Sequence, residues 1–358
     1  MRRFAILYGA LLAALLAACS GAEAPSSTDA AAASTLGDSG GAVSVAKPPA
    51  PMTPKDVLAG TVWPDAALGD GVASISCSAD YDAGGDGQAL AGLDYFHVLD
   101  AMEPCRESGV LRLHYAGKVD AGFVDLMERS AAMAERMGIR SRVLDIDSAG
   151  GHIEQGIRAG DAIGNSGWTL WVREDAVCHS ACVLILAAAD NRIVSGKVGI
   201  HRMLRIGSQA TTRAELNAEL RGVHQQLSDY LQRNGAAVAV ADLMMTVPSR
   251  DLRMLTPEEL RLYGLEGANA VQQDLERVTL LRECGEDFVR RREGFMRSFE
   301  EQCGRGEAAI DDKNACAREL LPRFGFPDGS CAAHTPMAEI GGQSAGDAGS
   351  GPLQGTAW

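Results

Sequence analysis

The chain has 358 residues, of which 46% are apolar, 22% charged and 5% aromatic. This apolar fraction excludes a wholly disordered chain, and the length suffices for one large domain or two ordinary ones. The 47 acidic residues outnumber the 33 basic ones and leave a formal net charge of −14, so a nucleic-acid partner is not expected. Nine cysteines are typical of a protein from an oxidising compartment.

The beginning of the chain has the pattern of a secretion signal. Arg2 and Arg3 precede an apolar run over 4–18, which is too short to span a bilayer as a helix. The run leads into Leu-Ala-Ala-Cys at 16–19, which resembles a bacterial lipobox, whose cysteine is acylated and becomes the first residue of the mature chain. We therefore expect a signal peptide over 1–18 and a membrane anchor of more than one acyl chain on Cys19. An ordinary secretory signal with a chance cysteine is the alternative.

The segments at both ends of the mature chain differ in composition from the middle. Ser20 follows the lipobox cysteine where aspartate would be expected for retention in the inner membrane, so the resemblance implies an outer-membrane lipoprotein that faces the periplasm. Residues 19–55 are rich in Ala, Ser, Gly and Pro and predict a flexible, lipidated tether. The glycine-rich residues 336–358 predict a disordered tail.

The segment over 56–271 alternates strand patterns with helix patterns. Strands are expected at 110–115, 142–147, 168–177, 191–195 and 198–201. Helices are expected at 120–137, 153–165, 181–189, 212–233 and 236–246, and a capping box with proline at the first helical position begins another at 256–257. Repeated strand–helix units of this kind predict an α/β domain.

Residues 272–335 are charged and helical and carry a group of cysteines. We expect a disulfide-stapled helical appendage there, with pairings confined to Cys284, Cys303, Cys316 and Cys331. Among the cysteines of the α/β segment, local closure favours a bond between Cys77 and Cys105. Cys178 and Cys182 form either a disulfide or two buried thiols.

Three local features of the α/β segment carry candidate chemistry. Ser148-Ala149-Gly150-Gly151 follows a strand, and a glycine pair lets the backbone turn sharply and direct an N–H into a site. Ser180 lies where a strand leads into a buried helix, a position that favours a developing oxyanion, although serine is also a common N-cap. His201 follows a short strand, where a histidine is either structural or a general base.

The order of these features resembles the ClpP-type serine peptidases of the ClpP/crotonase superfamily over about residues 108–270. That family has a Ser-Pro-Gly-Gly turn, then a nucleophile before an apolar helix, then Ile-His, and an Arg-Asp pair before a Pro-Glu…Tyr-Gly-Leu segment. The matching residues here are Ser148-Ala149-Gly150-Gly151, Ser180, Ile200-His201, Arg250-Asp251, Pro257-Glu258 and Tyr263-Gly264-Leu265.

The resemblance implies a ClpP/crotonase-like fold of repeated β-β-α units and a serine peptidase site. Ser180 would be the nucleophile, His201 the general base and Asp251 the acid that holds the imidazolium. The N–H groups of Gly151 and Ala181 would form the oxyanion hole. Neither a cofactor nor a metal is implied, and without ATP outside the cytoplasm the expected substrates are peptides or partly folded envelope proteins.

Departures from the family pattern keep other functions open. Ala149 replaces the proline of the turn, the interval from Ser180 to His201 is a few residues shorter than in cytosolic relatives, and Arg202 follows the histidine where the family has an amide. The alternative is a catalytically inactive ClpP-like module that binds protein partners, and homo-oligomers are compatible with either function. A Ser–Lys dyad using Lys197 and an acyl-CoA enzyme are weaker alternatives. His179 is expected to line the cleft, whereas Asp145 and Asp147 are expected to be solvated or to act as caps.

Overall fold

The computed structural model describes residues 61–78, 80–205, 207–304 and 310–337. The chain divides into two units, Met1–Pro51 and Met52–Trp358, and every described residue belongs to the second. The predicted signal peptide, Cys19 and the predicted tether lie outside the described residues, as does the predicted tail beyond residue 337.

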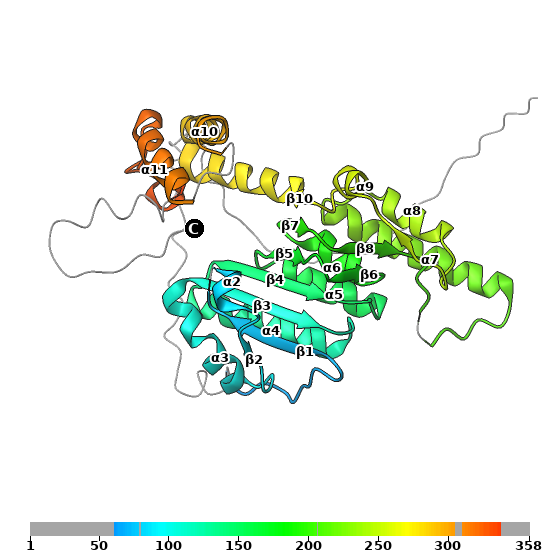
Figure 1. Cartoon of the computed structure of the whole chain (residues 1–358). Helices are drawn as coiled ribbons and strands as arrows, with labels where there is room; N and C mark the ends of the chain where they lie inside the picture. The colour runs from blue at the N-terminus through cyan, green and yellow to red at the C-terminus, as the bar shows by residue number, and fades with distance from the viewer. Residues whose placement is uncertain (1–60, 79, 206, 305–309, 338–358) are drawn as a thin grey trace, which may run out of the picture. The chain divides into compact units, whose positions relative to one another are not determined.

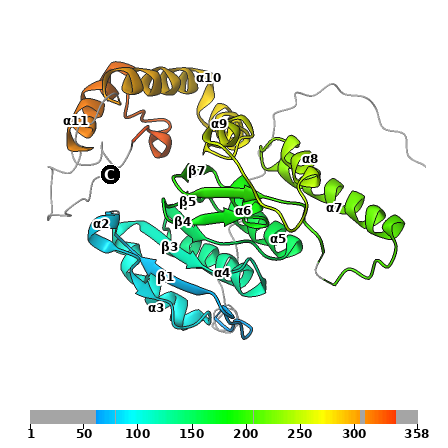
Figure 2. The ribbon, with the colours of Figure 1, turned by 45° about the vertical axis from the view of Figure 1, so that its right-hand side comes forward.

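A mixed sheet of seven strands organises the described α/β region, in the order β10-β7-β5-β4-β3-β1-β2 (Figure 1, Figure 2). Strands β3, β4, β5 and β7 run parallel, whereas β1 and β2 at one edge and β10 at the other pair antiparallel. The strands are β1 (Val72–Ser76), β2 (Gln88–Ala89), β3 (Val110–Ala116), β4 (Ser141–Asp147), β5 (Thr169–Val172), β7 (Asn191–Val194) and β10 (Gly267–Ala268). The predicted α/β class is confirmed at this level.

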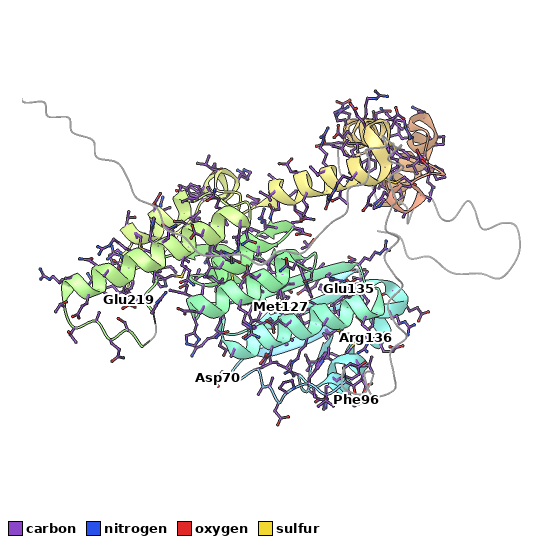
Figure 3. All side chains as sticks on the ribbon, turned by 180° about the vertical axis from the view of Figure 1, so that it is seen from behind. Asp70, Phe96, Met127, Glu135, Arg136 and Glu219 are labelled. Carbon is purple, nitrogen blue, oxygen red and sulfur yellow. A yellow bond between two sulfur atoms is a disulfide. The ribbon has the colours of Figure 1, made fainter. Side chains whose placement is uncertain are left out.

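Helices pack on one face of this sheet, because alternate strand residues direct apolar side chains toward it. Leu113 of β3 and Ile146 of β4 are fully buried in the same core cluster as Met127 of α4. Figure 3 shows α4, with Met127 labelled, from behind. The helices of this core are α3 (Tyr95–Ser108), α4 (Ala121–Met137), α5 (Ile153–Gly164) and α6 (Cys182–Ala188). None of the described helices is both long enough and apolar enough to cross a membrane.

A smaller sheet of three strands lies in the order β6-β8-β9. Its strands are β6 (Val177–His179), β8 (Lys197–Ile200) and β9 (Arg253–Met254). The single strand predicted over 168–177 is therefore wrong, because the chain turns after β5, where the Ala176 N–H donates to the Arg173 carbonyl. β6 then enters the second sheet, where it pairs with β8 in parallel.

The remaining elements of the α/β region are α2 (Tyr81–Gly84), α7 (Arg213–Arg233), α8 (Ala239–Thr246) and α9 (Pro257–Leu262). The capping box predicted at the start of α9 is confirmed. The Thr256 side chain accepts from the Glu259 N–H, the Glu259 carboxylate accepts from the Thr256 N–H, and Pro257 occupies the first helical position.

The C-terminal region has its own apolar cluster, which includes Phe288, Phe295 and Phe326. It comprises α10 (Ala270–Gln302), α11 (Ile310–Leu320), η1 (Leu321–Phe324) and η2 (Ala332–His334). The boundary predicted between residues 271 and 272 falls inside α10.

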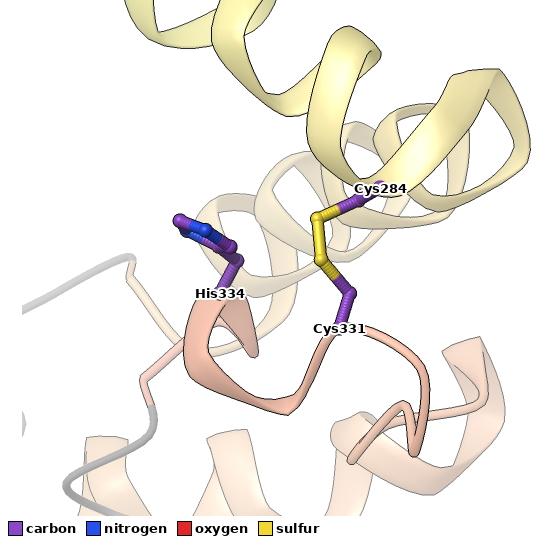
Figure 4. A group of neighbouring side chains, drawn as sticks. All are labelled: Cys284, Cys331 and His334. Carbon is purple, nitrogen blue, oxygen red and sulfur yellow. A yellow bond between two sulfur atoms is a disulfide. The ribbon is translucent and has the colours of Figure 1, made fainter. Parts of the chain in front are cut away.

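The eight cysteines of the described residues form four disulfides, which confirms the predicted use of cysteine. Cys77 bonds to Cys105 as predicted, and Cys178 bonds to Cys182. The four C-terminal cysteines pair among themselves, as Cys284–Cys331 and Cys303–Cys316 (Figure 4).

The carboxyl group of Asp190, between α6 and β7, is expected to make the stability of the fold depend on pH. Burial, reinforced by the charge of Glu276 and opposed by Arg192, raises the pKa of Asp190 to about 6. The folded state therefore holds this proton more tightly than the unfolded chain, so stability falls as the pH rises from about 4 to about 6. We expect Asp190→Asn to raise the free energy of unfolding by on the order of 1 kcal/mol at pH 7 and to change it little at pH 4. Urea titrations at both pH values measure this, and an equal effect at both would contradict it.

Candidate active site

Two turns of the backbone meet beside the second sheet. One is the glycine turn over 148–151, which follows β4, and the other is the elbow over 179–181, which joins β6 to α6. The His179 N–H donates to the Ser148 carbonyl at 2.9 Å. A β-carbon placed on Gly150 would lie 2.6 Å from the Ser180 β-carbon and 3.0 Å from the Ala181 nitrogen. The close approach of the two turns therefore requires glycine at position 150, where φ is 99°.

Ser180 has an unusual backbone conformation for a residue other than glycine. Its φ is 55°, in the left-handed region that L-residues with a side chain seldom adopt. Its N–H donates to the Gly199 carbonyl of β8 at 2.9 Å, and the residue is 7% exposed. Such strained conformations persist only where the surrounding structure holds them, and they cluster at functional sites.

The two backbone N–H groups predicted to form an oxyanion hole are available. Within the part of the chain that the structure describes, neither the Gly151 N–H nor the Ala181 N–H donates to an acceptor. Ala181 is fully buried, and buried N–H groups are nearly always paired. An unpaired N–H next to Ser180 is therefore suited to donate to a ligand oxygen.

His201 directly follows β8, which pairs with β6, the strand that leads to Ser180. In the parallel register of β6 and β8, His179 lies beside Gly199, and neighbouring strands lie about 4.8 Å apart. The half-buried His201 ring has its Nδ1 atom 3.0 Å from the Arg202 carbonyl. Because a carbonyl only accepts, this bond requires hydrogen on Nδ1 and leaves Nε2 able to take a proton.

Asp251 lies on a neighbouring turn, but its carboxylate is in a different environment. The antiparallel pairing of Ile200 with Arg253 brings this segment beside β8. The Asp251 side chain is 57% exposed and lies 4.0 Å from the Arg250 guanidinium. No hydrogen bond or ion pair joins Asp251 to His201 within the described ranges, and the Arg202 carbonyl accepts from Nδ1 instead. The acid role of Asp251 stays a prediction.

Two other residues near Ser180 have different surroundings. The His179 ring packs on Gly199, and burial lowers its pKa, which favours the neutral imidazole at pH 7. Lys197 is exposed and lies beside Val177 in the β6–β8 register, three residues before the serine. At about 3.3 Å per strand residue, the backbone of Lys197 lies roughly 10 Å from that of Ser180, so the structure gives the dyad alternative no support.

A buried polar network that the sequence did not indicate lies on the face of the large sheet opposite α4, where His114 of β3 lies beside Asp145 of β4. Asp145 is 1% exposed, and the Arg173 Nε atom lies 2.8 Å from its Oδ2 atom. The same guanidinium contacts His114 Nδ1 at 3.0 Å and pairs with Asp86 at 3.0 Å. These residues come from separate strands and a loop, so no local sequence pattern marks them. Asp145 is thus ion-paired rather than solvated.

Asp147, by contrast, acts as a cap, as expected. Its Oδ1 atom accepts from the Val177 N–H at 3.0 Å and so ties the end of β4 to the start of β6. A cavity of about 460 Å³ lies beside it, lined by Tyr81, His114, Asp147, Trp171, Arg173, Glu174, Asp175 and Ala176.

In the part of the chain that the structure describes, two groups of side chains have spacings that a metal ion could use. Ligand atoms of Asp86, His114 and Asp145 lie within 4.8 Å of one another, but the Arg173 guanidinium already pairs with both carboxylates. The second group, Cys284, Cys331 and His334, is shown in Figure 4. Its two sulfurs are joined in a disulfide, and thiolate ligands are therefore absent from it.

Comparison with known proteins gives a limited result. No protein-family model matches the chain, and no curated protein matches it. Among solved structures, the 1510-N membrane-bound stomatin-specific protease, solved as a serine-to-alanine mutant, matches with a TM-score of 0.35 and 17% identity. The match covers 46% of this chain and 81% of that one. Arguments about function therefore rest on the residues of this chain.

Proposed function

We propose that this protein is a ClpP-like serine peptidase that hydrolyses peptides or partly folded proteins without ATP. The observation that carries the proposal is the left-handed backbone of Ser180 at the junction of β6 and α6, packed against Gly150. A sharp turn of this kind presents a serine hydroxyl beside backbone N–H groups, as acyl-transfer chemistry requires.

The proposed mechanism assigns each step to a group of this chain. The Ser180 oxygen attacks the scissile carbonyl carbon while His201 Nε2 takes the hydroxyl proton. The N–H groups of Gly151 and Ala181 stabilise the oxyanion that develops. His201 then gives the proton to the leaving amine, and a water molecule, deprotonated by the same nitrogen, hydrolyses the acyl-enzyme. The Arg202 carbonyl keeps the imidazole in the required tautomer throughout.

Labelling with a fluorophosphonate probe tests the proposed nucleophile directly, because such probes phosphonylate activated serines. Wild-type protein should be labelled at Ser180, and peptide mapping should locate the adduct there. Ser180→Ala should abolish the labelling, whereas Ser228→Ala should retain it, since the Ser228 hydroxyl donates to the His224 carbonyl within α7. Absence of labelling in the wild type would remove the peptidase proposal.

The position of Asp251 predicts a small effect for its replacement. Because the Arg202 carbonyl accepts from His201 Nδ1, and the Asp251 carboxylate is largely exposed, we expect Asp251→Asn to lower kcat on a peptide ester less than about tenfold. Loss of the acid in an assembled triad costs about 10⁴ in kcat. Steady-state kinetics distinguish the two cases, and a loss near 10⁴ would show that Asp251 moves onto the imidazole during turnover.

The second candidate is an inactive ClpP-like module that binds protein partners. Two observations favour it: Ser180 is only 7% exposed, and no hydrogen bond or ion pair joins Asp251 to His201 among the described residues. A folded wild-type protein that neither reacts with the probe nor hydrolyses esters would support this function.

We propose further that the mature protein is anchored in the bacterial outer membrane through Cys19. The support is the sequence pattern that resembles a lipobox, together with the disulfides of the described residues, which are typical of oxidising compartments. Mass spectrometry of the mature N-terminus should find a lipid-modified Cys19. A mature chain that begins beyond this residue without lipid would contradict the anchor.

A further inference from the structure

A single disulfide joins the two ends of the short segment that carries Ser180. Cys178 lies in β6 and Cys182 is the first residue of α6, and their α-carbons are 5.1 Å apart. The bond therefore encloses only His179, Ser180 and Ala181, which are the residues of the elbow. Both cysteines are fully buried, so the bond is shielded from solvent.

The backbone on either side of Ser180 is held by the second sheet and by α6. Cys178 pairs with Val198 in the second sheet, and α6 is buried over its whole length. At Ser180 itself, the N–H donates to the Gly199 carbonyl, the carbonyl accepts from the Val183 N–H, and Gly150 packs closely; each such hydrogen bond restrains the backbone only modestly. A non-glycine residue with φ of 55° tends to return to the right-handed or extended regions unless its neighbours prevent it.

We propose that the Cys178–Cys182 disulfide is the positioning element that holds Ser180 in its left-handed conformation. The bond fixes the distance between the end of β6 and the start of α6. The three residues between them can span this distance only in a tight turn. ClpP-type peptidases have a proline in the glycine turn where this chain has Ala149. The elbow over 179–181 packs against that turn, and the disulfide makes the elbow more rigid. The catalytic part of this inference rests on the proposed function.

The test replaces the two cysteines with residues that favour the secondary structure at each position. Cys178→Val/Cys182→Ala puts a strand-forming residue in β6 and a helix-forming residue in α6. The matched control is Cys77→Ala/Cys105→Ala, which removes another disulfide of the same region, between the partly buried Cys77 and the buried Cys105, with a sequence separation of 28. Circular dichroism and thermal unfolding test whether both variants fold, and Cys178→Ala/Cys182→Ala provides a second variant if the first does not.

Hydrogen exchange measures the conformation of the elbow without any need for activity. The Ser180 amide should exchange at least tenfold faster in Cys178→Val/Cys182→Ala than in the wild type, and should not change in the control variant. Unchanged exchange at Ser180 would overturn the proposal.

Labelling by the fluorophosphonate probe measures the effect on the nucleophile. A displacement of about 1 Å at a reacting group costs about 10²-fold, so the rate constant for labelling should fall by about that factor in Cys178→Val/Cys182→Ala and remain near wild type in the control. Faster exchange with an unchanged labelling rate would refute the positioning role. Wild-type protein that is never labelled would refute the peptidase function, while the exchange experiment would still decide whether the disulfide holds the elbow.

Discussion

Replacing Ser180 with alanine is expected to lower kcat on a peptide ester by about 10⁴- to 10⁶-fold, the largest effect of any single substitution in this chain. The serine oxygen is the atom that bonds to substrate in the proposed mechanism, and an alanine leaves only the binding groups and the N–H donors of Gly151 and Ala181. His201→Ala should cost a similar factor, because the serine hydroxyl is a weak nucleophile without a base at Nε2.

The double variant Ser180→Ala/His201→Ala separates a catalytic pair from two independent residues. Residues that act as one unit are strongly non-additive, so the double variant should be little slower than either single variant. His224→Ala is the matched histidine control, since His224 is paired with Asp242 on α7 and α8 and should leave kcat unchanged. Losses that multiply in the double variant would show that His201 does not serve Ser180.

Gly150→Ala is expected to give the next largest effect, a loss of about 10²- to 10³-fold in kcat together with a lower stability. The added β-carbon would lie 2.6 Å from the His179 carbonyl oxygen and 2.6 Å from the Ser180 β-carbon, and φ at this position is 99°. The backbone must move, because these contacts are not to the far ends of flexible side chains. The glycine turn and the elbow would separate, which would misplace the N–H of Gly151 relative to the serine.

The matched control for Gly150→Ala is Gly222→Ala. Gly222 lies in α7, and a β-carbon there would meet no atom within 4 Å. Alanine should therefore stabilise α7 by up to about 1 kcal/mol and leave activity unchanged. Measurements of kcat and of unfolding in urea for both variants test the prediction. Wild-type turnover by a folded Gly150→Ala protein would exclude this turn from the site.

The sequence by itself determined the class of the fold and most of its regular elements. The helix over 121–137 and the buried helix over 182–188 follow from local periodicity and apolar composition, which depend on nearest neighbours along the chain. One cysteine pair could be predicted for a similar reason, since closure over a short separation favours Cys77 with Cys105, whereas the pairing among the four C-terminal cysteines was left open. The region over 72–108 was not assigned, because its strands are short and its helix α3 contains Pro104.

The tertiary structure decided the conformations and contacts that depend on distant residues. The left-handed backbone of Ser180 is packed against Gly150 and donates to the β8 carbonyl of Gly199, and no local pattern encodes these contacts between distant residues. The resemblance to ClpP-type peptidases implied Asp251 as the partner of His201, and the pairing of Ile200 with Arg253 does bring that segment beside β8, but the Arg202 carbonyl accepts from Nδ1. Sequence order can indicate which residues reach one site, but directed bonds of about 3 Å depend on how separate segments of the fold pack together.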